Sequence, residues 1–210
     1  AFHRTGYDTV HGMGKWNRPL EYKNLDIHRP RRYIVSFKGS IRAWENMYWQ
    51  HRWLAAEYWE NANDVLVDVK CNGRPNYRND DYGSILLNST FVFCPGGGSV
   101  MSFRFGKALE AGAIPVVTST FLPPLYPDVD WSACLVRVSD ARIVDLPRML
   151  RSISLPEVRS RQRSCLRLHT LLFVDNLNQK HMEMALRVWN SRITAALTMD
   201  NDIRKLVAAS

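Results

Sequence analysis

Three consecutive glycines, Gly96 to Gly98, stand between an apolar run typical of a β-strand and a run typical of a helix. Glycine lets backbone N–H groups approach a ligand closely, and the positive end of a helix dipole stabilises a phosphate. The spacing matches neither the GxGxxG fingerprint of dinucleotide-binding folds nor the GxxxxGK[ST] loop of nucleoside triphosphatases. From the residues alone, this segment is therefore either a phosphate-binding loop or a plain glycine turn.

Hydroxyl and cationic side chains follow the glycines at the start of the predicted helix. Ser99 and Ser102 are placed to cap that helix or to donate to a phosphate oxygen. Arg104 and Lys107 put positive charge into its first turn and a half, where it opposes the helix dipole. A bound anion would remove that conflict, whereas the alternative is that both side chains point into solvent.

A second segment has the same ingredients as the glycine loop. After the first predicted strand, the sequence FKGSIR provides Lys38 and Arg42 around a glycine and a serine. Two basic loops at one edge of one sheet favour the phosphate interpretation over the glycine turn.

Two short carboxylate patterns resemble metal-binding motifs. Asp128 with Asp130, and Asp200 with Asp202, match the DxD pattern with which many sugar-transferring enzymes hold manganese. So short a pattern is frequent by chance, and the two lie in a proline-rich loop and on the terminal helix. The histidines show no paired ligand spacing. We therefore expect no metal site.

The bulk composition limits the class of protein. The chain has 210 residues, of which 46% are hydrophobic, and this suits a packed domain rather than a disordered chain. No run of about 18 apolar residues predicts a membrane span, although an anchor could lie outside this chain. The net charge of +8 favours an anionic partner, such as a nucleotide, a sugar nucleotide, an acidic glycan, a lipid head group or a nucleic acid. Because no nucleic-acid-binding motif is present, we expect no nucleic acid partner.

The cysteines Cys71, Cys94, Cys134 and Cys165 are scattered, without a CxxC or zinc spacing. We expect buried free thiols rather than a disulfide framework. The cysteine pattern therefore leaves the redox compartment open.

The elements that must position these residues alternate along the chain. Short apolar runs predict strands at 33–37, 64–69, 90–94, 113–119 and 134–138. Helical patterns separate or follow them, at 42–62, 78–89, 102–112 and 141–153. A final helical region has one apolar face, formed at spacings of three and four by Met182, Leu186, Trp189, Ile193 and Leu197.

This alternation predicts an α/β fold with a mostly parallel sheet and helices on both of its faces. Ligands on such sheets bind beyond the carboxyl ends of the strands. The rule points to the loops that follow Phe37, Val69, Cys94 and Val117.

Several segments, taken in order, resemble the exostosin family of glycosyltransferases, glycosyltransferase family 47. They are RRYIVSFKGS, NDVLVDVKC and YGSILLNSTFVFCPGGGSVMSFRFGKALEAGAIPVV, followed by LPPLYPDVDW and LVRVSDARIVDLPRMLRSIS. The resemblance covers about residues 30–160 with few gaps. The opening FHRTGYDTV is also similar to a segment of the family's amino-terminal domain.

The resemblance implies an enzyme that moves a sugar from a nucleotide sugar, usually a UDP-sugar, to a hydroxyl of a glycan acceptor without requiring a metal. Lys38 and Arg104 would hold the donor diphosphate. An inverting reaction needs a general base, for which Asp8 is a candidate, although a structural role is the simpler alternative for this aspartate. The other expected donor-binding residues are Arg42, Pro95, Gly97, Gly98, Ser99, Ser102 and Lys107.

The resemblance also implies a GT-B architecture, in which two Rossmann-like domains face each other across a cleft. Residues 1–30 would be the tail of the acceptor-side domain or a linker, and 31–165 the nucleotide-sugar-binding domain. Residues 166–210 would be helices that cross back toward the amino-terminal domain. A cellular member would lie in the Golgi or the secretory lumen, and a soluble viral or microbial member in the cytoplasm.

Two positions depart from the family's pattern. The family usually has Pro-Arg-Gly where this chain has Pro95, Gly96 and Gly97, and usually has a glutamate where this chain has Lys107. That glutamate is expected to accept hydrogen bonds from the donor ribose, which an ammonium cannot do. Glu110, one turn further on, is a poorly placed substitute. The alternatives are altered donor contacts, a different nucleotide, or an inactive domain that serves as a scaffold or partner subunit in glycan synthesis.

Overall fold

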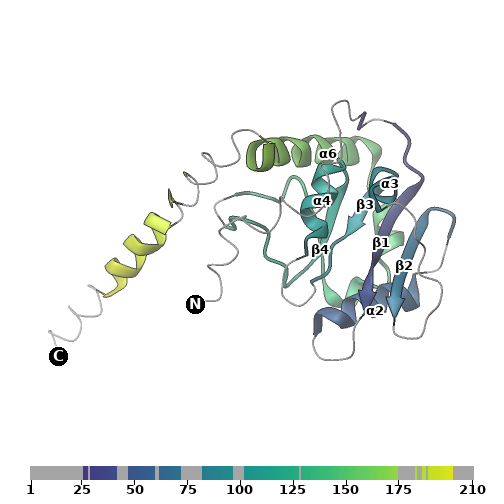
Figure 1. The fold of residues 1–210 in the computed structure, drawn as a ribbon, viewed down its shortest axis with the longest axis horizontal. Coiled ribbons are helices and arrows are strands. Elements are labelled where there is room, and N and C mark those ends of the chain that lie inside the picture. The colour runs from purple at the N-terminus through teal and green to yellow at the C-terminus, as the bar shows by residue number, and fades with distance from the viewer. Residues whose placement is uncertain are drawn as a thin grey trace.

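The computed structural model describes residues 26–27, 29–41, 47–59, 62–71, 82–96, 102–127, 129–174, 183, 186–187 and 189–200 (Figure 1). The strands are β1 (Tyr33–Ile41), β2 (Val65–Cys71), β3 (Ser89–Phe93), β4 (Ile114–Thr118) and β5 (Val136–Val138). The helices are α2 (Met47–Tyr58), α3 (Tyr82–Leu87), α4 (Arg104–Glu110), α5 (Leu146–Arg151) and α6 (Leu155–His169). A 3₁₀ turn, η3 (Asp140–Arg142), precedes α5, and a π-helical turn, η4 (Thr170–Val174), continues α6.

The five strands form one parallel sheet in the order β2-β1-β3-β4-β5, which confirms the predicted fold class. β1 pairs with β2 as far as Ile41 and Cys71. Its pairing with β3, in contrast, ends at Ser36 and Val92. The strands β1 and β2 therefore continue past the carboxyl end of β3, and leave a step at this edge of the sheet.

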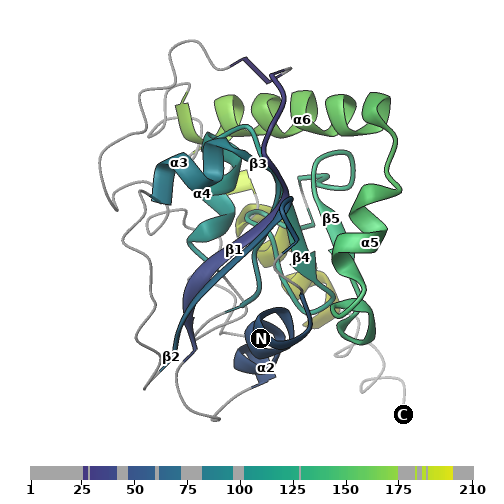
Figure 2. The ribbon, with the colours of Figure 1, turned by 90° about the vertical axis from the view of Figure 1, so that its right-hand side faces the viewer.

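Helices cover both faces of the sheet. Right-handed crossovers require α3 and α4 to lie on one face and α2 on the other, and Figure 2 shows α3 and α4 on the opposite side from α5. Both figures show α6 across one end of the sheet and α2 at the other, toward which the arrow of β1 points. The helix α2 therefore lies near the carboxyl ends of the strands.

The core explains why the central strands carry almost continuous apolar runs. All residues of β4 are buried, as are Phe91, Val92 and Phe93 of β3, because both faces of these strands are covered. The ring of Phe93 contacts Phe37 at 5.8 Å and Trp59 at 5.1 Å between centroids. The end of α2 is thereby packed against the middle of the sheet.

Local signals in the sequence account for two of the helix ends. α4 has Ala111 as its C-cap and is followed by Gly112, whose φ of 60° is the left-handed conformation that glycine tolerates best and that commonly ends a helix. α6 begins after Ser154, whose side chain accepts a hydrogen bond from the Glu157 N–H.

The expectation of free thiols is wrong for two cysteines. Cys134 and Cys165 form a disulfide, with their Cα atoms 4.7 Å apart, which joins the segment before β5 to α6. No local pattern indicates this pairing, because 31 positions separate the two residues. Cys94 is a buried free thiol, as expected.

The final helical region is present over residues 189–200, together with residues 183 and 186–187. The predicted apolar face is exposed at the positions that the structure describes, namely Leu186, Trp189, Ile193 and Leu197. Met182 lies outside the described residues. No helix in the described part of the chain is both long and apolar enough to span a membrane.

Candidate functional site

Part of the predicted glycine loop is described, at the carboxyl end of β3. Pro95 and Gly96 are buried, and the Gly96 carbonyl accepts a hydrogen bond of 2.9 Å from Arg52 Nε. The other expected loop residues, Gly97, Gly98 and Ser99, lie outside the described residues. Arg42 and Asp8 lie outside them as well, so their roles stay predictions.

Arg104, the first residue of α4, joins that helix to β1. Its Nε and Nη2 donate to the Lys38 carbonyl at 3.2 and 2.6 Å, and its Nη1 donates to Ser102 Oγ at 3.0 Å. The guanidinium also stacks over the Phe37 ring, 4.8 Å from its centroid. The structure thus brings the two basic segments together at one edge of the sheet, as the sequence indicated.

Gly39 is part of the same arrangement. A Cβ atom at this position would stand 2.6 Å from Nη2 of Arg104, closer than real side chains approach. Only glycine therefore leaves room for the guanidinium against β1.

Lys38 is buried and paired. Its Nζ donates to Asp68 Oδ2 at 2.7 Å, and the two residues are register partners on β1 and β2. A buried ammonium without such a carboxylate would carry a large desolvation cost. The ammonium of Lys38 is therefore held by Asp68, and its expected contact with a diphosphate stays a prediction. The sequence pattern did not single out Asp68, because it reads as one polar residue within an apolar strand.

Arg52 is a buried cation of the site that the sequence pattern did not reveal. Besides Gly96, it reaches the Ser40 carbonyl, to which Nη1 donates at 2.8 Å. Burial, followed by repulsion from Arg104, lowers the pKa of Arg52 to about 10, against an opposing effect of Tyr82. Two guanidinium groups thus stand close enough at this edge to repel each other.

The buried thiol of Cys94 lies at the same edge. Burial raises its pKa to about 12, although the nearby Arg104 opposes this shift. Because the thiolate is the reactive form, Cys94 is an inert core residue and no nucleophile.

Lys107 forms an ion pair within its own helix. Its Nζ lies 2.7 Å from Oε2 of Glu110, and both side chains are largely buried. His169, at the end of α6, lies near this pair. Burial lowers the pKa of His169, Glu110 raises it and Lys107 lowers it again. The departure at position 107 therefore has a local counter-charge in this chain.

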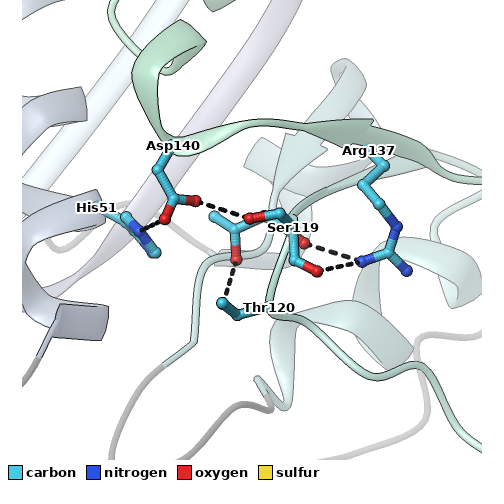
Figure 3. A network of polar contacts seen from close by, with 6 residues as sticks. His51, Ser119, Thr120, Arg137 and Asp140 are labelled. Atoms are coloured by element: carbon cyan, nitrogen blue, oxygen red, sulfur yellow. Dashed lines mark hydrogen bonds and ion pairs between the residues drawn. The ribbon is translucent and has the colours of Figure 1, made fainter.

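A second polar network lies after β4 and β5 (Figure 3). His51 Nε2 lies 3.3 Å from Asp140 Oδ2, and Ser119 Oγ donates to Asp140 Oδ1 at 3.2 Å. Nη1 of Arg137 donates to the carbonyls of Thr118, Ser119 and Phe121. The aspartate stands between the serine and the histidine, so this is no Ser-His-Asp triad, in which the histidine must be central. The network instead ties the loop after β4 to η3 and α2.

The described residues contain no group of three histidine, cysteine, aspartate or glutamate side chains arranged to hold a metal ion. Of the two DxD patterns, Asp130 is exposed and accepts a hydrogen bond of 2.8 Å from the Ser132 N–H. Hydrogen bonding by Ser132 lowers the pKa of Asp130. Asp128 and Asp202 lie outside the described residues.

The arrangement is suited to binding an anion. The described partners of the Arg104 guanidinium are all uncharged: the Lys38 carbonyl, the Ser102 hydroxyl and the Phe37 ring. Its positive charge is therefore not neutralised by these contacts, and Arg52 adds a second one nearby. An oxyanion at this edge would relieve the repulsion between the two arginines.

Comparisons with known proteins identify the family of this chain. Residues 9–153 match the family described as the Exostosin GT47 domain. An exostosin-1 homolog of Caenorhabditis elegans is 28% identical over 177 residues, which are 70% of this chain and 44% of that protein. A probable glycosyltransferase of Arabidopsis thaliana is 35% identical over 100 residues, 47% of this chain and 18% of that protein. The chain thus spans less than half the length of these relatives.

Among solved structures, the chain is similar to the C-terminal domain of a glycosyl transferase group 1 family protein from Francisella tularensis. That similarity has a TM-score of 0.44 at 14% identity, and covers 67% of this chain and 86% of the other.

Proposed function

Because this chain belongs to the exostosin GT47 domain family, a family of glycosyltransferases, we propose that it binds a UDP-sugar at the carboxyl edge of its sheet and transfers the sugar to a hydroxyl of a glycan. The observation that carries the proposal is Arg104, a half-buried guanidinium with uncharged described partners beside the glycine loop. A diphosphate is the part of such a donor that this charge would bind.

In the proposed reaction, the protein stabilises the leaving nucleotide by fixed positive charge. Arg104 would face the diphosphate, and Arg52 would add to the positive potential from within the protein. Charges that are already oriented stabilise a developing anion without reorganisation, and this effect would serve in place of a metal. Asp8 stays our candidate for the general base that accepts the proton of the acceptor hydroxyl.

We propose the division of the chain that the resemblance implied: 1–30 as acceptor-side tail or linker, 31–165 as donor domain and 166–210 as helices crossing back. The exposed apolar face of Leu186, Trp189, Ile193 and Leu197 supports the last part. A face of this kind is more stable when another apolar surface covers it. The amino-terminal domain of a longer protein is the expected cover.

The disulfide supports a location in the secretory pathway. Disulfides persist in oxidising compartments and are rare in the cytosol. Of the two locations that the sequence left open, the Golgi or secretory lumen is therefore the one we propose.

A scaffold without catalytic activity is the second candidate. The pairing of Lys107 with Glu110 favours it, because the carboxylate nearest to the position of the expected ribose-binding glutamate is engaged by an ammonium. A scaffold would bind a partner glycosyltransferase or a glycan without turning over a donor.

Calorimetric titration of the chain with UDP tests the donor site, with Arg104→Ala as the matched variant. We expect binding by the wild-type chain and a loss of at least about tenfold in affinity for the variant, because a charged hydrogen bond contributes about 1.5 to 3 kcal/mol. A folded wild-type chain that does not bind UDP would refute the proposed donor site.

Thermal shift against a panel of nucleotides and nucleotide sugars then defines the donor. A ligand that binds only the native state raises the melting temperature by mass action. Binding without hydrolysis or transfer of any sugar, by the full-length protein that contains this chain, would favour the scaffold over the enzyme.

A further inference from the structure

One helix bonds three parts of the candidate site directly: the end of β1, the Gly96 segment after β3 and η3 after β5. α2 carries two adjacent polar side chains, His51 and Arg52, and both are at least nine-tenths buried. Helices normally bury apolar residues at such positions, because a buried polar group is costly unless it is bonded. The two residues are therefore best explained by the groups that they hold.

Arg52 holds the end of β1 and the segment after β3 together. Its Nε and Nη1 donate to the carbonyls of Gly96 and Ser40 at 2.9 and 2.8 Å. The planar guanidinium presents its donors at fixed angles, so it fixes the distance and the orientation between the two carbonyls. A lysine has the same charge but cannot impose this geometry.

His51 holds the segments after β4 and β5. Its Nε2 is 3.3 Å from Asp140, and the other oxygen of that carboxylate accepts the Ser119 hydroxyl proton (Figure 3). The opposite ring nitrogen, Nδ1, is buried and has no hydrogen-bond partner. An orphaned nitrogen is a cost that an apolar residue would avoid, so packing alone does not explain the histidine.

The remainder of α2 is firmly anchored. Its neighbour Trp59 donates from Nε1 to the Ile143 carbonyl at 2.8 Å and packs on the ring of Phe93. Ala55, within α2, is fully buried. A helix anchored in this way holds His51 and Arg52 in fixed positions.

We propose that His51 and Arg52 are positioning residues that, through α2, hold the end of β1 and the segments after β3, β4 and β5 at the donor site in one fixed arrangement. This inference rests on the proposed function, because it assigns the two residues to the same UDP-sugar site. Loops ordered before binding need not be ordered by the ligand, and this saves binding free energy.

Calorimetric titration of the chain with UDP tests Arg52→Lys against Arg31→Lys. Arg31 is the matched control, because its guanidinium also donates to two carbonyls, those of Ser89 and Ala111, at the other edge of the sheet. Thermal unfolding of both variants measures their stability separately from affinity. We expect both to melt at lower temperature, but only Arg52→Lys to bind UDP at least about tenfold more weakly.

A second pair of variants tests the histidine, and does not depend on the folding of Arg52→Lys. Gln retains an N–H donor that can reach Asp140, whereas Leu does not. We expect His51→Gln to retain affinity for UDP within a few-fold, and His51→Leu to lose about as much as Arg52→Lys.

The outcomes separate the two proposals. If the wild-type chain does not bind UDP, the proposed function fails and this inference with it. The second outcome is that the wild-type chain binds UDP but the two members of each pair lose equal affinity. The pairs are Arg52→Lys with Arg31→Lys, and His51→Leu with His51→Gln. In that case the proposed function stands and the positioning role is refuted.

Discussion

Both edges of the sheet use arginine side chains to bond backbone carbonyls. At the amino edge, Arg31 bonds the carbonyls of Ser89 and Ala111, and Arg161 bonds those of Ser132 and Leu135. At the carboxyl edge, Arg52 and Arg104 bond carbonyls of β1 and of the segment after β3. Guanidinium groups thus fasten backbone at both ends.

The edges differ in how charge is balanced. Arg161 is paired with Glu157 at 2.9 Å, and the disulfide closes the same edge covalently. Arg104 has uncharged described partners, and it repels Arg52 enough to contribute to the lowered pKa of that residue. The comparison teaches that Arg161 and the disulfide reinforce the amino edge, whereas Arg104 at the carboxyl edge has no carboxylate among its described partners.

Removing the disulfide is the change from which we expect the largest effect, and it concerns the stability of the amino edge. Replacing both Cys134 and Cys165 by serine should lower the free energy of unfolding by about 3 to 4 kcal/mol, because the bond closes a loop of about 30 residues. Affinity for UDP at a temperature where the variant is folded should stay within a few-fold. Chemical denaturation and calorimetry measure the two quantities, and a parallel loss of both would abolish the distinction between the edges.

Gly39→Ala should produce the reverse pattern. The new Cβ would meet Arg104 Nη2 at 2.6 Å, so the guanidinium must move away from β1. We expect about tenfold weaker UDP binding, equivalent to about 1.4 kcal/mol, with a smaller change in stability. Ser152→Ala, at an exposed position, is the control and should leave UDP binding unchanged. Gly112 is unsuitable as a control because its φ is positive. Undiminished UDP binding by Gly39→Ala would show that the position of Arg104 is unimportant.

Exchanging Lys107 and Glu110 sharpens the question of how this chain departs from its family. The double variant Lys107→Glu with Glu110→Lys preserves the ion pair at its i,i+3 spacing and restores a carboxylate at position 107. We expect a several-fold gain in affinity for UDP with little change in melting temperature. The single variant Lys107→Glu is the control, since it creates two neighbouring carboxylates. Weaker binding by the double variant would indicate that Lys107 itself contacts the donor.

The smallest expected effect concerns an exposed pair at the amino edge. Asp64, before β2, accepts hydrogen bonds from Arg151 at 2.7 and 2.9 Å, and hydrogen bonding by this arginine lowers the pKa of Asp64. A lowered carboxyl pKa contributes stability above the unfolded value of about 4, and this is lost as the pH falls through the folded value. Arg151→Ala should therefore cost about 0.5 kcal/mol near neutral pH and nothing in acid. Urea denaturation at both pH values measures this, and a difference that persists in acid would contradict it.

The sequence was sufficient to predict a mostly parallel sheet and the edge at which its two basic segments lie. The alternation of apolar runs predicted the parallel sheet, and the loop rule brought Lys38 and Arg104 to one edge, where Arg104 now bonds the Lys38 carbonyl. These inferences succeed because hydrophobic periodicity and crossover handedness are local or general properties.

The residues that the sequence missed depend on tertiary neighbours. Arg52 and His51 lie in a helix whose pattern is dominated by aromatic residues, and nothing local distinguishes a buried polar residue from an exposed one. The roles of Asp68 and Asp140 become apparent only from their contacts with Lys38 and His51, which lie on other elements. For the same reason, β1 was expected to end at Phe37, because the polar residues that extend it to Ile41 are bonded by partners distant in sequence.

The disulfide also determines how this protein must be prepared for measurement. Cys134 and Cys165 secure α6 at the edge of the sheet opposite to Arg52 and Arg104, so a reducing buffer would loosen the chain without altering the residues that we propose for the donor site. Loss of activity in such a buffer would then report unfolding and could be mistaken for chemistry at a thiol. Protein that is produced in an oxidising compartment and handled without reductant keeps the disulfide. In that state, binding at the proposed donor site can be measured separately from unfolding.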